Sequence, residues 1–141
     1  MKIIQVTGRS NSGKTTFIRK LVPELKKIGA VGVIKHLGDH EYFLEAEKDT
    51  TFFYDAGANI TTGIDTKKTV IILQSTDLDD VLHFYADKGI QFAVIEGYKQ
   101  RSYAKIVIGN LDTDRCVLSN PTTDEVITSL NLFDDFKLIQ R

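Results

Sequence analysis

The feature that most constrains this chain of 141 residues is a glycine-rich octapeptide near its amino terminus. Residues 8–15 read Gly-Arg-Ser-Asn-Ser-Gly-Lys-Thr and fit the pattern G-x-x-x-x-G-K-[ST] at every position. An apolar, β-rich run at residues 3–6 precedes it, and apolar residues with helical spacing follow it. Strand, loop and helix in this order gather backbone N–H groups and the positive end of a helix at one point. The sequence therefore predicts a phosphate-binding loop.

Each residue type in this loop has a chemical reason to be there. Glycines let the backbone turn tightly and approach phosphate oxygens, the Lys14 ammonium reaches the β- and γ-phosphates, and the Thr15 hydroxyl completes the shell of a Mg²⁺ ion. The candidate phosphate-binding residues are Gly8, Ser10, Asn11, Ser12, Gly13, Lys14, Thr15 and Thr16. We expect a purine nucleoside triphosphate. The residues alone leave ATP and GTP open, because no N-K-x-D stretch that reads guanine is present.

The rest of the chain alternates strand and helix signals. We predict strands at residues 31–34, 60–64, 69–73, 92–95, 106–108 and 115–118, and helices at 14–28, 49–56, 78–85 and 132–139. Pro23 should kink the first helix or mark a local irregularity in it, and Asp77 should cap the third helix. Residues 37–47 should form a loop and residues 65–68 a turn. This pattern indicates an α/β protein with the three-layer P-loop NTPase fold and a mostly parallel central sheet. We expect one domain over residues 1–141, with a nucleotide-binding core at 1–109 and an extension at 110–141.

A second group of candidate residues follows the other buried strands. Glu96 comes directly after the apolar run 92–95, and Lys35 and His36 follow the strand at 31–34. Because the carboxyl ends of parallel strands share one edge of a sheet, we expect these side chains to face the phosphate loop. Glu96 could hold Mg²⁺ or one of its waters, and Asp49, after the acidic loop, is another candidate for a metal-bound water. Sequence spacing identifies no catalytic residue.

Composition narrows the possible partners and the location. Eighteen basic and 19 acidic residues leave a net charge of -1, which gives no overall basic field to favour nucleic acid. No apolar run reaches the roughly 18 residues that cross a bilayer, so we expect no membrane span. The chain has one cysteine, Cys116, which fits a residue in or near a strand in a reducing cytoplasm.

Several of these segments together resemble the MobB family of molybdopterin-guanine dinucleotide biosynthesis. The resemblance rests on four stretches, over about residues 1–109: residues 8–16, Val-Ile-Lys-His at 33–36, Lys-Asp-Thr at 48–50 with Ala-Gly-Ala at 56–58, and Glu-Gly-Tyr-Lys at 96–99 with Ala-Lys-Ile at 104–106. It implies a GTP-binding, Mg²⁺-dependent protein with weak GTPase activity. It also implies a homodimer, and as partners a MobA-like guanylyltransferase and molybdopterin. By position, Thr15, Asp49 and Glu96 would lie near the metal, and Lys35, His36 and Lys99 would line the same cleft.

Two other functions stay open alongside this one. The chain could be a P-loop kinase for a small molecule, although its five arginines are few for an arginine-rich lid. It could also be a nucleotide-sensing interaction module in which hydrolysis is vestigial. The aromatic run at residues 52–54 is expected to lie in the core, with a dimer contact as the alternative.

Overall fold

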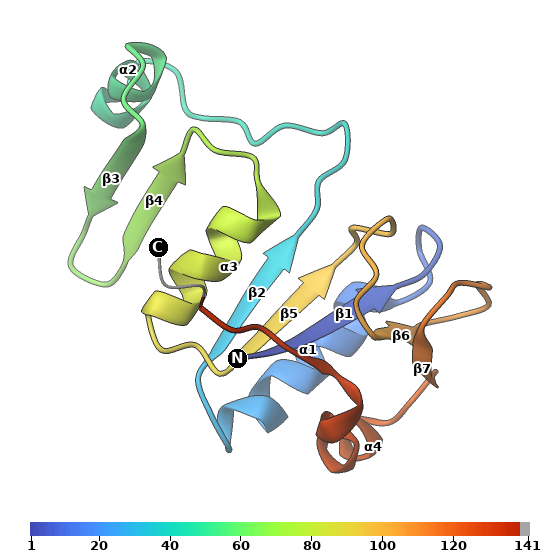
Figure 1. The fold of residues 1–141 in the computed structure, drawn as a ribbon. Coiled ribbons are helices and arrows are strands. Elements are labelled where there is room, and N and C mark those ends of the chain that lie inside the picture. Colours follow the sequence, from blue (N-terminus) through green and yellow to red (C-terminus); the bar gives the residue numbers. More distant parts are fainter. Residues whose placement is uncertain (139–141) are drawn as a thin grey trace. The chain divides into compact units, whose positions relative to one another are not determined.

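The computed structural model describes residues 1–138, and they form two compact units. The first unit contains residues 1–36 and the chain from residue 81 onward, and the second contains residues 37–80. The second unit is thus an insertion between a strand and a helix of the first (Figure 1). The organisation of the chain as a single domain stays a prediction.

The first unit is built on a parallel sheet. Its strands are β1 (Lys2–Thr7), β2 (Val31–Lys35), β5 (Phe92–Glu96), β6 (Lys105–Val107) and β7 (Cys116–Ser119), in the spatial order β2-β5-β1-β6-β7. The strands β1 and β5 are central and buried at nearly every position, which explains their continuous apolar sequences. All five predicted strands of this sheet are confirmed, and Cys116 lies exposed at the start of β7.

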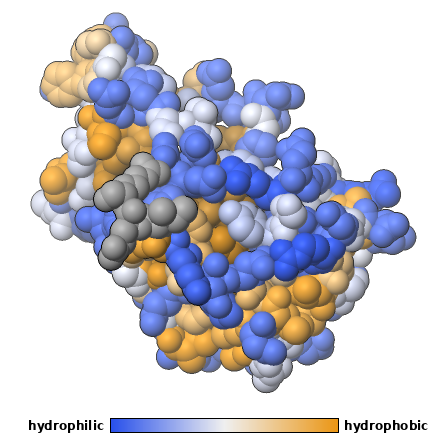
Figure 2. Space-filling view, in the orientation of Figure 1, coloured by the Kyte–Doolittle hydropathy of each residue, from blue (hydrophilic) through white to orange (hydrophobic). Residues whose placement is uncertain are grey.

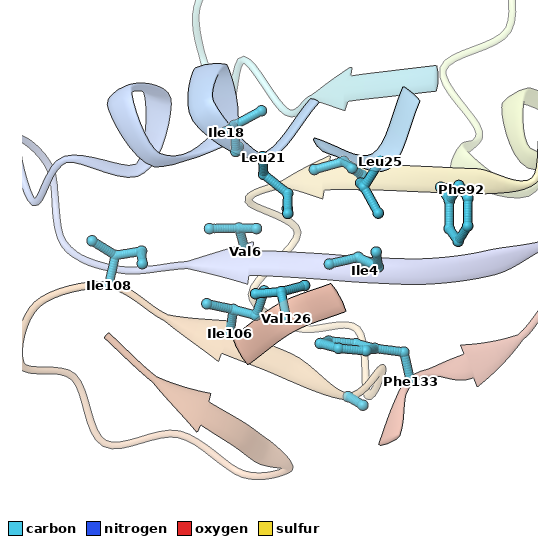
Figure 3. Packing of buried hydrophobic residues seen from close by; sticks show 12 residues of the cluster. Ile4, Val6, Ile18, Leu21, Leu25, Phe92, Ile106, Ile108, Val126 and Phe133 are labelled. Atoms are coloured by element: carbon cyan, nitrogen blue, oxygen red, sulfur yellow. The ribbon is translucent and has the colours of Figure 1, made fainter. Parts of the chain in front are cut away.

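Helices cover both faces of this sheet. On one face, α1 (Lys14–Lys26) and α4 (Thr123–Thr128) pack over a cluster of buried residues that includes Ile4, Val6, Leu21 and Val126 (Figure 3). On the other face, α3 (Leu78–Asp87) places the Tyr85 ring where a Cβ on Gly32 would be, and the Tyr85 hydroxyl donates to the Val33 carbonyl at 2.9 Å. The predicted α/β architecture with three layers is confirmed in this unit.

The roles predicted for Asp77 and Pro23 concern helices α3 and α1. The backbone N–H of Asp79 donates to the Asp77 carboxylate at 2.8 Å, so Asp77 caps α3 as expected. The helix α1 runs on through Pro23 and ends at Lys26, two residues earlier than predicted.

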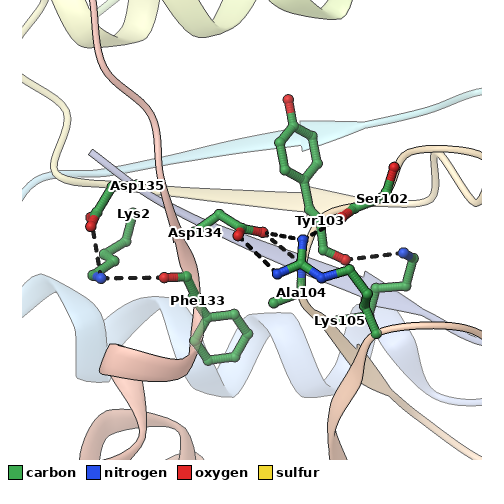
Figure 4. A network of polar contacts seen from close by, with 9 residues as sticks. Lys2, Ser102, Tyr103, Ala104, Lys105, Phe133, Asp134 and Asp135 are labelled. Atoms are coloured by element: carbon green, nitrogen blue, oxygen red, sulfur yellow. Dashed lines mark hydrogen bonds and ion pairs between the residues drawn. The ribbon is translucent and has the colours of Figure 1, made fainter.

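The prediction of a helix at residues 132–139 is wrong over the described residues, and Ile139 lies outside them. The chain forms a single 3₁₀ turn, η1 (Leu130–Leu132), and then a short strand, β8 (Asp134–Asp135), that pairs antiparallel with the start of β1. Charge partners compensate the poor strand propensity of aspartate: Asp135 contacts Lys2 at 3.1 Å, and Asp134 makes a bidentate pair with Arg115 (Figure 4). These long-range contacts decide the local structure.

The second unit is a short helix and a hairpin. Helix α2 (Asp49–Asp55) contacts the first strand of the antiparallel pair β3 (Ile60–Ile64) and β4 (Thr69–Leu73). In the connecting turn, the Asp65 carboxylate accepts from the N–H groups of Lys67 and Lys68 at 2.7 and 2.8 Å. The predicted hairpin and its turn at 65–68 are confirmed. Within residues 1–138, no helix combines the length and the apolar character that spanning a bilayer requires.

The aromatic run in α2 does not lie in the core, as the sequence analysis expected. Phe52 and Phe53 are 54% and 58% exposed, and none of the α2 residues is buried. A seven-residue helix beside a two-stranded sheet has too few neighbours to enclose large rings. Apolar side chains gather on the surface over α2 and the hairpin (Figure 2).

Candidate functional site

The candidate site lies at the carboxyl edge of the parallel sheet, within the first unit. Strand β1 ends at Thr7 and leads into the glycine-rich loop, β2 ends at Lys35, and β5 ends at Glu96. The parallel register pairs Val6 with Glu96 and Lys35 with Glu96, so the three strand ends are level. The sequence prediction that Gly8, His36 and Glu96 emerge at one edge is confirmed (Figure 1).

The glycine-rich loop has the backbone of an anion-binding turn. Asn11 and Gly13 both adopt left-handed conformations, with φ of 61° and 100°. Such turns make successive N–H groups converge on one point. Helix α1 begins directly after Gly13, has no acidic residue in its first turn, and receives no side-chain cap from the described residues. Its first N–H groups and its positive end therefore suit a negatively charged ligand.

The turn after β6 packs against the glycine-rich loop and supports it. A Cβ on Gly8 would lie 2.5 Å from the Ile108 carbonyl oxygen, and one on Gly109 would lie 3.3 Å from the Ser12 Cβ. Asn120 fixes this turn, because its side-chain amide accepts from the Gly109 N–H at 2.7 Å and donates to the Gly109 carbonyl at 3.0 Å. Gly8 thus serves close packing under the loop, and the loop has a rigid support.

Lys14 lies folded over the loop. Its ammonium donates to the carbonyls of Gly8 and Arg9 at 3.0 and 2.9 Å. Partial burial lowers the pKa of Lys14 below its ordinary value; the Glu96 carboxylate opposes this shift, and the positive charges of Lys99 and Lys35 add to it. An anion at the loop would relieve the repulsion among these three cations.

Glu96 is the acid of the site. Its side chain is 12% exposed, and its Oε1 atom lies 3.4 Å from the Lys35 ammonium and 3.5 Å from the Thr15 hydroxyl. A hydroxyl and a carboxylate at this spacing fit Mg²⁺, which takes one or two protein oxygens and completes its shell with phosphates and water. Within residues 1–138, no cluster of three or more His, Cys, Asp or Glu residues could hold a metal by itself. Thr15 and Glu96 suit a metal that a bound nucleotide helps to hold.

One pocket of about 510 Å³ collects most of the predicted residues. Its lining consists of Ser10, Asn11, Ser12, Gly13, Lys14, Thr15, Thr16, Lys35 and Glu96. Gly8 supports this loop from below, and Lys99 is near enough for its charge to act on Lys14. His36 lies beside the pocket, where its ring stacks on Tyr98 with centroids 4.2 Å apart. Asp49 is the first residue of α2 in the second unit, and its role near a metal stays a prediction.

The residue that holds the turn after β5 was not among the predicted site residues. Gln5 lies in the middle of β1, is fully buried, and donates from its amide nitrogen to the carbonyls of Gly97 and Tyr98 at 2.8 and 2.7 Å. Both of these residues are left-handed, with φ of 97° and 52°. The sequence did contain a signal for this role: the Gln5 amide lies inside the apolar run 3–6, and a buried polar group needs a hydrogen-bond partner.

Comparison with known proteins assigns the chain to a family. The sequence model of the MobB family, described as molybdopterin guanine dinucleotide synthesis protein B, matches residues 3–130. A Haemophilus influenzae protein named molybdopterin-guanine dinucleotide biosynthesis adapter protein is 27% identical over 133 residues, which cover 91% of this chain and 72% of that protein.

Two further relatives carry names that assign them provisionally to the same adapter. The Methanocaldococcus jannaschii protein is 35% identical over 100 residues, and the Bacillus subtilis protein is 34% identical over 114 residues. These matches cover 71% and 75% of this chain but 42% and 64% of those proteins. The chain thus spans less than two thirds of their lengths.

Solved structures agree with this assignment. The crystal structure of Bacillus subtilis MobB matches with a TM-score of 0.66 and 28% identity, over 84% of this chain and 77% of that one. A MobB homologue from Bacillus stearothermophilus matches with a TM-score of 0.60 and 22% identity, over 93% and 94% of the two chains, which supports the fold alone. With a family model that matches residues 3–130 and with these relatives, the chain belongs to the MobB family.

Proposed function

We propose that this chain binds GTP with Mg²⁺ and serves as an adapter in the synthesis of molybdopterin guanine dinucleotide. The observation that carries the proposal is the pocket that residues 10–16, Lys14 among them, line together with Lys35 and Glu96. The loop and the start of α1 would hold the phosphates, Lys14 would leave the Gly8 and Arg9 carbonyls for a phosphate oxygen, and Thr15 and Glu96 would hold Mg²⁺. Bound Mg²⁺ supplies charge neutralisation at the β- and γ-phosphates.

Guanine specificity rests on the family rather than on a base-reading motif. The family description names a guanine dinucleotide, whose synthesis requires a guanine nucleotide. We expect slow hydrolysis, because Arg9 is the one arginine next to the phosphates by sequence and its Nε donates to the Asn110 carbonyl at 3.1 Å. Efficient GTPases need a positioned glutamine or an arginine finger at the reacting phosphate.

We further propose that the chain acts as a cytoplasmic homodimer and meets a MobA-like guanylyltransferase and molybdopterin. The hairpin supports a contact between two copies. One of its faces carries Ile60, Ile64 and Ile71, which are 60%, 79% and 41% exposed, and among the described residues β3 and β4 pair only with each other. We call these three residues the hairpin face. Two copies can bury such a face symmetrically.

Thermal unfolding with added nucleotide tests the proposal. A ligand at 100 times its Kd adds roughly 2.7 kcal/mol of stability, which corresponds to about 5–10 °C in Tm for a chain of this size. We expect this shift with GTP and Mg²⁺, a smaller one with GTP alone, and little change with ATP. A larger response to ATP would favour the small-molecule kinase, and no response to either nucleotide would contradict the proposal.

A further inference from the structure

We infer that Gln5 is a positioning residue that sets the metal-binding geometry of Glu96 from inside the sheet; this inference rests on the proposed function of the same site. Gln5 touches neither Thr15 nor the glycine-rich loop by any hydrogen bond of its side chain among the described residues. Its effect is exerted through the turn that follows Glu96.

The turn needs an external brace because its backbone is strained. Gly97 and Tyr98 are consecutive left-handed residues, and a bulky residue with a φ of 52° is unusual. A Cβ on Gly97 would lie 3.0 Å from the His36 Cβ, so the tight contact favours glycine at this position as well. The Gln5 amide nitrogen donates to the carbonyls of both residues, which ties the strained turn to the centre of β1.

The two hydrogen bonds from Gln5, which we call the brace, also fix Glu96 before the turn and the Tyr98 ring within it. On one side, the His36 N–H donates to the Glu96 carbonyl at 2.9 Å and the Gly97 N–H donates to the Val6 carbonyl at 3.1 Å, so the backbone at Glu96 is held from both neighbouring strands. On the other side, the Tyr98 ring lies against the His36 ring at 4.2 Å with an angle of 16° between the planes. If the turn relaxed, both the carboxylate and this ring stack would lose their positions.

Burial makes the Gln5 amide hard to replace. Its side chain lies on the same face of β1 as Ile3 and Thr7, it is fully buried, and its Oε1 atom has no partner among the described residues. An apolar side chain of equal size would fill the space at this position. It would leave the partly buried Gly97 carbonyl without a donor and the Tyr98 carbonyl with the Arg101 N–H, at 2.9 Å, in place of two donors, so the turn would lose its link to β1. Polar groups that orient a metal ligand in this way typically change metal affinity by about 10–100-fold when removed.

The experiment compares Gln5→Met with Ile3→Val in the full chain. Ile3 is buried on the same face of the same strand, so its variant measures loss of packing without loss of the brace. GTP affinity is measured by calorimetry with and without Mg²⁺. We expect Gln5→Met to reduce the gain in affinity that Mg²⁺ provides by about tenfold, with metal-free GTP affinity within about twofold of the wild type. Ile3→Val should leave both values unchanged.

A second readout does not depend on nucleotide. The chain has three histidines, and the ring proton signals of His36, identified with a His36→Gln variant, should be shifted upfield in NMR spectra by the stacked Tyr98 ring. We expect this shift to be lost in Gln5→Met and kept in Ile3→Val. If Gln5→Met does not fold, Gln5→Glu, which keeps the size but has no donor when ionised, takes its place.

The outcomes separate the inference from the proposed function. If the wild type binds no GTP, the proposed function fails, while the His36 signals still test the brace. If the wild type binds GTP more tightly with Mg²⁺ but Gln5→Met behaves like Ile3→Val in both measurements, the inference is overturned and the proposed function stands.

Discussion

The two units of this chain differ in how far they bury their apolar side chains. In the first unit, the central strands are sealed between helices, and Ile4, Val6, Val94 and Ile106 have no exposed surface. In the second unit, α2 and the hairpin leave large apolar side chains in water, with Ile64 79% exposed. Burial of apolar surface drives folding, so the first unit supplies its own stability whereas the second keeps apolar surface available for contact.

The proposed function would use this difference by giving each unit its own task. A phosphate site needs backbone groups fixed within a fraction of an ångström, and in the first unit Gly8, Asn120 and the start of α1 fix the backbone of the glycine-rich loop. An adapter also needs a surface that a partner can cover. We propose that the first unit binds the ligand and that the second contacts partners, and the following variants test that division.

The largest expected effect is on the phosphate site. Lys14→Ala should weaken GTP binding by at least about 100-fold, because it removes the ammonium that lies against the Gly8 and Arg9 carbonyls of the loop, and the Tm shift with GTP should disappear. The Tm of the nucleotide-free protein should change little, since Lys14 is only partly buried. Thermal unfolding with and without GTP gives both values. A variant that still responds like the wild type would mean that the phosphates bind elsewhere.

The next effect concerns the hairpin face and the association of two copies. Ile71→Lys puts a charge in the middle of that face and should weaken the dimer by about 10–100-fold, because a charge is costly to bury without a partner. Val70→Lys is the matched control, since Val70 is the neighbouring residue on the opposite face of the same strand. Sedimentation velocity at several concentrations measures the dimer Kd. Equal behaviour of the two variants would rule out this face as the contact.

A smaller effect is expected at the acid of the site. Glu96→Gln keeps the size of the side chain and removes its charge, so the gain in GTP affinity that Mg²⁺ provides should fall by about tenfold. Binding without metal should stay the same or improve slightly, because a negative charge near the phosphates is gone. Calorimetric titrations in Mg²⁺ and in EDTA check this. An equal loss in both conditions would argue against a role in metal binding.

The smallest effect concerns the stability of the first unit. Arg115 and the Ala104 N–H hold the pKa of Asp134 below its usual range, with the Arg115 hydrogen bond as the larger cause. A carboxyl with a lowered pKa stabilises the fold above its unfolded pKa, and this contribution is lost as the pH falls through the folded value. Asp134→Asn should therefore lower the free energy of unfolding by roughly 1 kcal/mol at pH 7 and by less at pH 3, because pH 3 lies below the ordinary pKa of the carboxyl. Urea unfolding at the two pH values tests this, and a difference that does not depend on pH would contradict it.

Local signals made most of the first unit predictable from the sequence. The glycine-rich turn between β1 and α1, the alternation of strands with helices, and the hairpin with its Asp65 turn all depend on residues close together in the chain. The short helix α4 had such a signal too. Its Thr122 accepts from the Glu125 N–H at 3.1 Å in a T-x-x-E capping box, which the sequence analysis did not use.

What could not be predicted depends on contacts between distant residues. The strand β8 exists because Asp134 and Asp135 meet Arg115 and Lys2, and neither pairing is visible in the local sequence. Gln5 has the pattern of an ordinary strand residue, because the turn at residues 97–98 that it contacts is distant in the sequence. Phe52 was expected in the core because aromatic residues are usually buried, but the second unit is too small to enclose it.

The central claim is that the first unit alone provides a triphosphate site built around Lys14. Calorimetric titration of the wild type and of Lys14→Ala with GTP, both in Mg²⁺, tests it most directly. The account predicts saturable binding by the wild type near one GTP per chain, and no measurable heat from Lys14→Ala. Equal affinities for the two proteins, or no binding by the wild type, would contradict it.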